Sequence, residues 1–206
     1  MPKTIVTIGG NIGCGKSTLL RECVISIPRA KSSVVFPEPI EKWGSWLDMF
    51  YSNPTKYGFQ LQMKILVDFL YFDASHDDTI VITERSPLDS LHVFCKLMVD
   101  SKTITHMEYN LFKEYMDTIS WQPNVYIYLK TTPEACFQRM KDRSRECETG
   151  VDFSYIKNLH MAYEKFIETI KEQPTIEVYE IDATQDKESV NQQTRVILEK
   201  YDFFSQ

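Results

Sequence analysis

The sequence predicts an α/β fold of three layers, in which helices cover both faces of a five-stranded parallel sheet. Two observations support this prediction. Five runs rich in β-branched and other apolar residues alternate along the chain with segments of helical apolar periodicity. The first run leads directly into residues 10–17, Gly-Asn-Ile-Gly-Cys-Gly-Lys-Ser, which have the spacing of a phosphate-binding P-loop. We therefore expect a P-loop NTPase-like fold.

Composition narrows the class of protein. A chain of 206 residues without a linker rich in proline, glycine or serine indicates one domain, residues 1–206. The net charge of −6 argues against a nucleic-acid partner bound through a basic face. Five cysteines without C-x-x-C spacing indicate a reduced, intracellular protein, and no apolar run reaches the ~18 residues of a membrane span. We expect a cytoplasmic protein with no membrane partner, although nuclear or organellar residence stays open.

The P-loop is flanked by the elements that it requires. Residues 3–8 are expected to form the first strand, and residues 17–27 the following helix. The loop glycines let successive N–H groups point at one anion, and the helix adds its positive dipole end. Lys16 should reach the outer phosphates, and the Ser17 hydroxyl should bind Mg²⁺. A glycine-rich turn without a ligand is the weaker alternative. The expected phosphate-binding residues are Gly10, Asn11, Ile12, Gly13, Cys14, Gly15, Lys16, Ser17 and Thr18.

The second strand is expected to end in a functional carboxylate. A connection over residues 28–33 leads to a strand over residues 33–38, which closes on Glu38-Pro39. Ligands of open parallel sheets bind outside the carboxyl ends of the strands, so Glu38 should lie at the ligand edge. A helix follows over residues 43–51, and Asn53-Pro54 should end it, because proline disfavours helix at the preceding residue.

A long helix is expected from about residue 56 to residue 74. Gln62 falls within its apolar stripe, where an amide without hydrogen-bond partners costs about 1–3 kcal/mol. Gln62 must therefore bond either to neighbouring backbone or to a ligand, and the spacing alone leaves both interpretations open. The apolar members of the stripe are Ile65, Leu66, Phe69 and Phe72.

The continuous apolar run at residues 79–83 predicts a central strand that delivers Glu84, Arg85 and Ser86 to the ligand edge. An acid at this place can hold Mg²⁺ from the side opposite the P-loop serine. A surface ion pair between Glu84 and Arg85 is the alternative, and the P-loop disfavours it. Pro87 suits the first turn of the next helix. The apolar face of that helix consists of Leu88, Leu91, Phe94, Cys95 and Met98.

The second half continues the alternation. Residues 105–108 have capping-box spacing and should open a helix to about residue 121. The remaining elements are a strand over residues 124–129, a helix from Thr132-Pro133-Glu134, a helix over residues 153–170, a strand over residues 175–182 and a helix over residues 187–201.

A basic cluster follows the helix that Thr132 opens. Arg139, Lys141, Arg143 and Arg145 concentrate positive charge in an acidic chain. Taken alone, such a cluster is more often a solvated face. Beside a P-loop it indicates a lid, about residues 139–150, whose arginines offset the charge of the transferring phosphoryl group.

These motifs, in this order, resemble the deoxynucleoside kinase family, which includes deoxycytidine, deoxyguanosine and mitochondrial thymidine kinases and a broad-specificity insect enzyme. The resemblance rests on residues 10–18, 38–43, 84–86 and 139–148, followed by Tyr155 and residues 159–160, and covers nearly the whole chain. It implies transfer of the γ-phosphoryl group of ATP, or of another nucleoside triphosphate, to the 5′-hydroxyl of a deoxynucleoside in nucleotide salvage. It also implies Mg²⁺ as cofactor and a homodimer, with helices between residues 90 and 121 as the candidate interface.

The resemblance implies roles on the side of the reacting groups. Glu38 would be the general base that takes the proton of the 5′-hydroxyl, with Arg85 beside it. Glu84 would hold Mg²⁺ together with Ser17. The phosphates would be surrounded by Arg139, Arg143 and Arg145.

The resemblance also implies how the nucleoside is held. Gln62 would make two hydrogen bonds to the base, and Trp43 and Phe94 would pack against base and sugar. Tyr51 and Glu148 would hold the 3′-hydroxyl, which selects deoxyribose over dideoxy analogues.

The chain departs from the family pattern at several positions. Leu61 replaces a phenylalanine before the base-binding glutamine, and Cys147 stands where the lid often has another acid. Ile65, Phe69 and Ser90 shape the far side of the base pocket. Because the arginine and aspartate of the deoxycytidine and deoxyguanosine kinases are here Phe69 and Ser90, we expect a pyrimidine preference, thymidine and deoxycytidine before purines, although Phe69 is bulky enough to crowd the thymine methyl group.

Two other functions were weighed. A thymidylate-type nucleoside monophosphate kinase would need extra basic groups for its acceptor phosphate, which the Glu38 carboxylate would repel. A regulatory P-loop ATPase is disfavoured because the chain lacks an Asn-Lys-x-Asp guanine-reading motif and an Asp-x-x-Gly switch. The sequence favours a deoxynucleoside kinase.

Overall fold

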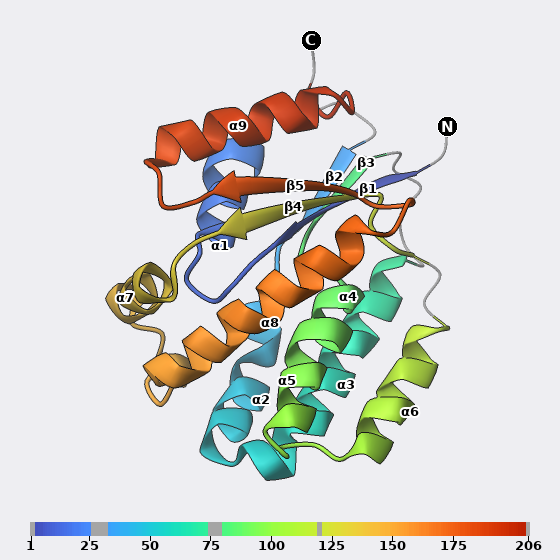
Figure 1. The fold of residues 1–206 in the computed structure, drawn as a ribbon, viewed down its shortest axis with the longest axis vertical. Helices are drawn as coiled ribbons and strands as arrows, with labels where there is room; N and C mark the ends of the chain where they lie inside the picture. Colours follow the sequence, from blue (N-terminus) through green and yellow to red (C-terminus); the bar gives the residue numbers. More distant parts are fainter. Residues whose placement is uncertain (1–2, 26–32, 74–79, 119–120, 205–206) are drawn as a thin grey trace.

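A computed structural model describes residues 3–25, 33–73, 80–118 and 121–204 (Figure 1). Its centre is a five-stranded sheet in the order β2-β3-β1-β4-β5, in which every neighbouring pair is parallel. The strands are β1 (Thr4–Gly9), β2 (Ser33–Phe36), β3 (Ile80–Glu84), β4 (Val125–Lys130) and β5 (Glu177–Asp182). The predicted sheet is confirmed.

Helices cover both faces of the sheet, as predicted (Figure 1). Helices α1 and α9 lie on one face, and α8 lies with α2 to α6 on the other. The helices are α1 (Lys16–Leu19) with a π-helical continuation (Leu20–Ile25), α2 (Ile40–Ser52), α3 (Pro54–Asp73), α4 (Pro87–Asp89) with a π-helical continuation (Ser90–Cys95) into α5 (Lys96–Asp100), α6 (His106–Met116), α7 (Pro133–Arg143), a 3₁₀ turn (Glu146–Glu148), α8 (Phe153–Lys171) and α9 (Lys187–Glu199).

Strand β4 shows how the layers are held together. Its side chains alternate, so that the buried Val125, Ile127 and Leu129 pack in a core with α1 and α9. Tyr126 and Tyr128 pack on the opposite face against α8. Both faces of the strand are therefore buried from solvent, which explains its continuous apolar sequence.

Several predicted boundaries are wrong. Helix α3 begins at Pro54 instead of residue 56, because proline lacks only an N–H that the first turn would leave unpaired. Helix α6 ends at Met116 instead of about residue 121, and the Thr118 hydroxyl donates to the carbonyl of Tyr115 at 2.6 Å beyond that end. Strand β5 begins at Glu177, not residue 175. The predicted connection at residues 28–32, the helix ends at residues 26–27 and 74, and residue 79 lie outside the described residues.

The topology brings the strand ends that precede functional side chains to one edge. Strands β1, β3 and β2 are parallel neighbours, so the P-loop, Glu84 and Glu38 leave the sheet on the same side. Among the described residues, the helices include none that is long and apolar enough to span a membrane.

Candidate active site

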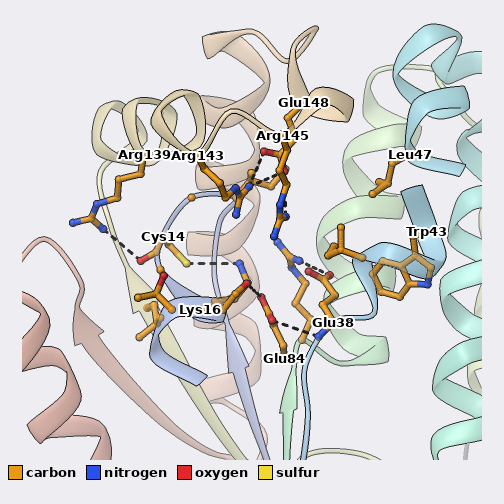
Figure 2. Close-up of a pocket in the computed structure, with 18 of the residues that line it drawn as sticks. Cys14, Lys16, Glu38, Trp43, Leu47, Glu84, Arg139, Arg143, Arg145 and Glu148 are labelled. Atoms are coloured by element: carbon orange, nitrogen blue, oxygen red, sulfur yellow. Dashed lines mark hydrogen bonds and ion pairs between the residues drawn. The ribbon is translucent and has the colours of Figure 1, made fainter. Parts of the chain in front are cut away.

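A cavity of about 690 Å³ opens at this edge of the sheet (Figure 2). Its walls come from the P-loop, from α2 and α3, from the ends of β2 and β3, from the α7 region and from the segment between β5 and α9. Every site residue expected from the sequence lines it except Gly10 and Asn11, which are both buried. The predicted residues are therefore brought together in one place.

The P-loop has the conformation that its glycines permit. Gly13 has a φ of 79°, and a Cβ atom at this position would overlap the carbonyl oxygen of Cys136 in α7. The side chain of Asn11 anchors the loop, because its amide donates to the carbonyl of Ile156 in α8 at 2.9 Å. The Lys16 ammonium donates to the carbonyl oxygens of Gly10 at 3.0 Å and Asn11 at 2.8 Å. Among the described residues, Lys16 is thus held over the loop by neutral partners alone.

Two oxygens of a possible magnesium site meet across the sheet edge. The Ser17 hydroxyl donates to Oε1 of Glu84 at 2.8 Å, and the other carboxylate oxygen of Glu84 accepts from the backbone N–H of Glu38 at 3.4 Å. Hydroxyl and carboxylate oxygens are ligands that Mg²⁺ prefers, and Mg²⁺ often takes only one or two protein ligands beside phosphates and water. The residues present fit this ion.

Glu38, whose backbone N–H contacts Glu84, forms an ion pair with Arg85. Nη1 of Arg85 donates to Oε1 of Glu38, and the two side chains are only 9% and 12% exposed. The guanidinium also lies 5.2 Å from the ring centroid of Phe94. Burial lowers the pKa of Arg85, but the charges of Glu38 and Glu84 and the hydrogen bond to Tyr163 outweigh this effect, so the pKa stands well above its usual value. The pair is a fixed cation and a fixed carboxylate at the middle of the cavity.

The deeper part of the cavity is mostly apolar, with one unpaired polar atom. Gln62 is 2% exposed, and its buried Oε1 has no hydrogen-bond partner in the part of the chain that the structure describes. Trp43 is held by its indole N–H, which donates to Asp68 at 2.6 Å. Phe69 is fixed from behind, because the indole N–H of Trp121 donates to its carbonyl at 3.1 Å. The other expected nucleoside residues on this wall are Ile65, Ser90 and Phe94.

The arginines of the α7 region do not all point at the P-loop. Arg143 donates to both carboxylate oxygens of Glu148 at 2.7 Å, and Arg145 lies 3.5 Å from the same carboxylate. Figure 2 shows both guanidinium groups over the cavity, whereas Arg139 lies beside the P-loop and donates to the carbonyl of Cys14 at 3.5 Å and to that of Ala183 at 2.9 Å. The lid expected at residues 139–150 stays a prediction.

Tyr51 approaches Glu148 from α2. Burial raises the pKa of Tyr51 well above its usual value, and the neighbouring Tyr155 and Glu148 raise it further. The hydroxyl therefore stays protonated and available as a donor, next to the carboxylate with which it was expected to hold a sugar hydroxyl.

Sequence reasoning missed two groups of residues. The segment between β5 and α9 and the first residue of α9 line the cavity with Ala183, Gln185 and Lys187, and they carry no motif that could have marked them. Asp89 and Tyr163 lie buried behind Arg85. The Ser-x-x-Asp spacing of residues 86–89 was the one available signal for Asp89, and it indicates a helix cap as readily as a site.

Comparison with known proteins gives consistent matches over most of the chain. The family model described as deoxynucleoside kinase matches residues 6–204. A probable deoxycytidine kinase of fowlpox virus (strain NVSL) is 30% identical over 216 residues, covering 98% of this chain and 88% of that protein. The thymidine kinase of ictalurid herpesvirus 1 (strain Auburn) is 29% identical over 201 residues, covering 92% and 84%. The structure of deoxyadenosine kinase from M. mycoides with bound dCTP superposes with a TM-score of 0.82 at 21% identity, covering 96% of this chain and 100% of that chain.

Proposed function

The chain belongs to the deoxynucleoside kinase family, and we propose that it transfers the γ-phosphoryl group of ATP to the 5′-hydroxyl of a pyrimidine deoxynucleoside. One observation carries the proposal: the P-loop lysine, a largely enclosed carboxylate next to an arginine, and an amide oxygen without a partner among the described residues all line one cavity. These are a donor site, a base and an acceptor site in the order that phosphoryl transfer requires.

The donor enters at the P-loop end. The loop N–H groups and Lys16 bind the phosphates. Because the partners of the Lys16 ammonium are neutral carbonyls, its positive charge is not neutralised before the phosphates bind. Ser17 and Glu84 would hold Mg²⁺, which would neutralise charge on the phosphates. Arg143 and Arg145 supply further positive charge from the opposite wall.

The acceptor lies in the deeper part of the cavity. Gln62 pairs with the base, and Tyr51 with Glu148 holds the 3′-hydroxyl, so that the 5′-hydroxyl points toward Glu38. Glu38 takes the proton of this hydroxyl as the oxygen attacks the γ-phosphorus, while the bond from the γ-phosphorus to the β–γ bridging oxygen breaks and ADP leaves. Arg85 keeps the carboxylate in place and stabilises negative charge that develops near the 5′-oxygen.

The pyrimidine preference rests on the far wall. Phe69 and Ser90 offer no charged pair to a base there, and the Phe69 backbone is tied to Trp121. A wall that is bulky and fixed favours the smaller, single-ring bases. Thymidine and deoxycytidine are therefore proposed to react before the purine deoxynucleosides.

The test is kcat/KM for each of the four deoxynucleosides with ATP and Mg²⁺. We expect the two pyrimidines to give the higher values. A purine deoxynucleoside with the highest kcat/KM would overturn the preference while leaving the kinase activity. Thymidylate as the better acceptor, or phosphate release from ATP without added nucleoside at the same rate, would overturn the proposed reaction itself.

A further inference from the structure

A chain of buried hydrogen bonds leads from Arg85 away from the cavity into the core. Nε of Arg85 donates to the Tyr163 hydroxyl of α8 at 3.1 Å, and this hydroxyl donates to Oδ1 of Asp89 at 3.1 Å. Asp89 and Tyr163 are completely buried, and neither belongs to the cavity wall. The chain therefore connects the core to Glu38 through the single guanidinium of Arg85.

The direction of these hydrogen bonds is fixed. An arginine Nε–H can only donate, so the Tyr163 oxygen is the acceptor and its own proton is left for Asp89. Tyr163 is thus held on both sides, and it fixes the Nε edge of the guanidinium. The other edge of the guanidinium is then presented to Glu38. The backbone φ of Arg85 is 60°, which is uncommon for a residue with a side chain of this size.

Helix capping explains only half of the role of Asp89. Its Oδ2 accepts from the backbone N–H of Ser86 at 2.9 Å and from the Ser86 hydroxyl at 2.8 Å, which is the cap of α4. Its Oδ1 instead accepts from two tyrosine hydroxyls, that of Tyr126 at 2.6 Å and that of Tyr163. A helix cap needs only one carboxylate oxygen, so it does not explain why Oδ1 is bonded in the core. Burial raises the pKa of Asp89, and the hydrogen bonds from Tyr126 and Ser86 reverse part of this shift.

We propose that Asp89, acting through Tyr163, holds the Arg85 guanidinium in the orientation in which it meets Glu38. Asp89 and Tyr163 are then positioning residues for phosphoryl transfer. The inference rests on the proposed function, since it gives Arg85 and Glu38 their catalytic roles. The network contacts neither the base nor the donor. Its loss should therefore lower turnover rather than binding, because small misplacements of catalytic groups are costly.

Tyr126 provides a matched control for Tyr163. Both tyrosines are completely buried, both donate to the same oxygen of Asp89, and phenylalanine would remove only the hydroxyl from each. Among the hydrogen bonds of the described residues, only that of Tyr163 joins this pair of tyrosines to Arg85. A role in stability alone would affect both variants alike.

The experiment compares Tyr163→Phe with Tyr126→Phe by steady-state kinetics and thermal unfolding. We expect kcat of Tyr163→Phe to fall about 10- to 100-fold with the KM for deoxynucleoside changed by less than about threefold. Tyr126→Phe should keep kcat within about twofold, while both variants lose a similar amount of thermal stability. Unchanged kcat in Tyr163→Phe, or an equal loss in both variants, would overturn the inference.

A second readout does not depend on turnover. The Arg85 Nε–H gives a ¹H–¹⁵N NMR signal, assigned by its disappearance in Arg85→Lys, and its exchange with water should be slow in the wild type and in Tyr126→Phe. Tyr163→Phe should shift this signal and speed its exchange. If the wild type phosphorylates no deoxynucleoside while the NMR result is as expected, the proposed function fails and the catalytic part of the inference fails with it. If the wild type is active and the signal is unaffected by Tyr163→Phe, the inference alone fails.

Discussion

Replacing Gln62 with methionine should stabilise the protein without ligand and at the same time impair its recognition of the base. The amide oxygen of Gln62 is buried without a partner in a side chain that is 2% exposed. An unsatisfied buried polar atom costs about 1–3 kcal/mol, and methionine fills nearly the same volume with similar helix propensity. We therefore expect the free energy of unfolding to rise by about 1 kcal/mol or more, which for a chain of this size raises Tm by about 2–4 °C.

The same replacement removes the two hydrogen bonds that Gln62 is proposed to make with the base. At about 1.5 kcal/mol for each buried bond, kcat/KM should fall by about 100-fold. Urea unfolding measures the first effect and kinetics with the preferred deoxynucleoside the second. Gln60→Met, at an exposed position of the same helix, controls for the change of residue type and should alter stability by less than about 0.5 kcal/mol.

Each half of the prediction can fail separately. A Gln62→Met protein that unfolds at a lower urea concentration than the wild type would show that the oxygen is well solvated or bonded when no nucleoside is bound. A variant that keeps the wild-type kcat/KM would exclude Gln62 from base recognition.

The other predictions concern the reacting groups and the loops around them. Glu38→Gln should lower kcat about 10²- to 10⁴-fold while calorimetry still detects nucleoside binding, and near-normal turnover would remove Glu38 from the base role. Gly13→Ala should lower stability by about 1–3 kcal/mol and weaken ATP binding, because the added methyl group meets the carbonyl of Cys136 at a φ of 79°; unchanged unfolding and ATP affinity would contradict this. Glu148→Gln should lower kcat/KM for a deoxynucleoside more than for its 2′,3′-dideoxy analogue, and equal losses would show that the carboxylate acts only through Arg143 and Arg145.

The strands could be predicted because each is a short, nearly uninterrupted apolar run. Residues 79–83 were predicted and Ile80–Glu84 is observed, with every side chain of the strand buried. Helix ends were harder to predict, because they depend on contacts that local sequence does not encode. Pro54 shows this: a proline before a helix and a proline at its first position look alike in sequence, and α3 uses the second arrangement.

The site could be predicted as far as it follows strand ends. The P-loop, Glu38 and Glu84 each come directly after a strand, and parallel topology alone places them at one edge. The partners of these residues could not be predicted in the same way. Asp89 and Tyr163 are 74 residues apart, and only the packing of α8 on the sheet brings them together. The pairing of Arg143 with Glu148 likewise depends on the turn between them, which ends α7 at Ser144 with a φ of 53°.

The charges of the cavity show how an acidic protein can prepare a site for anions. Arg85 and Arg143 are each held by a carboxylate, Glu38 and Glu148 respectively, so that their positions are fixed before any ligand enters. An anion that recruits such an arginine must compete with its carboxylate. Lys16 differs, because its oxygen partners are the neutral carbonyls of the P-loop, which fix the ammonium without neutralising it. Arg139 resembles Lys16 in this respect, because among the described residues it donates to the carbonyls of Cys14 and Ala183. We therefore expect Lys16 and Arg139 to meet an incoming anion with their charge unpaired, whereas Arg85 and Arg143 would first have to separate from their carboxylates.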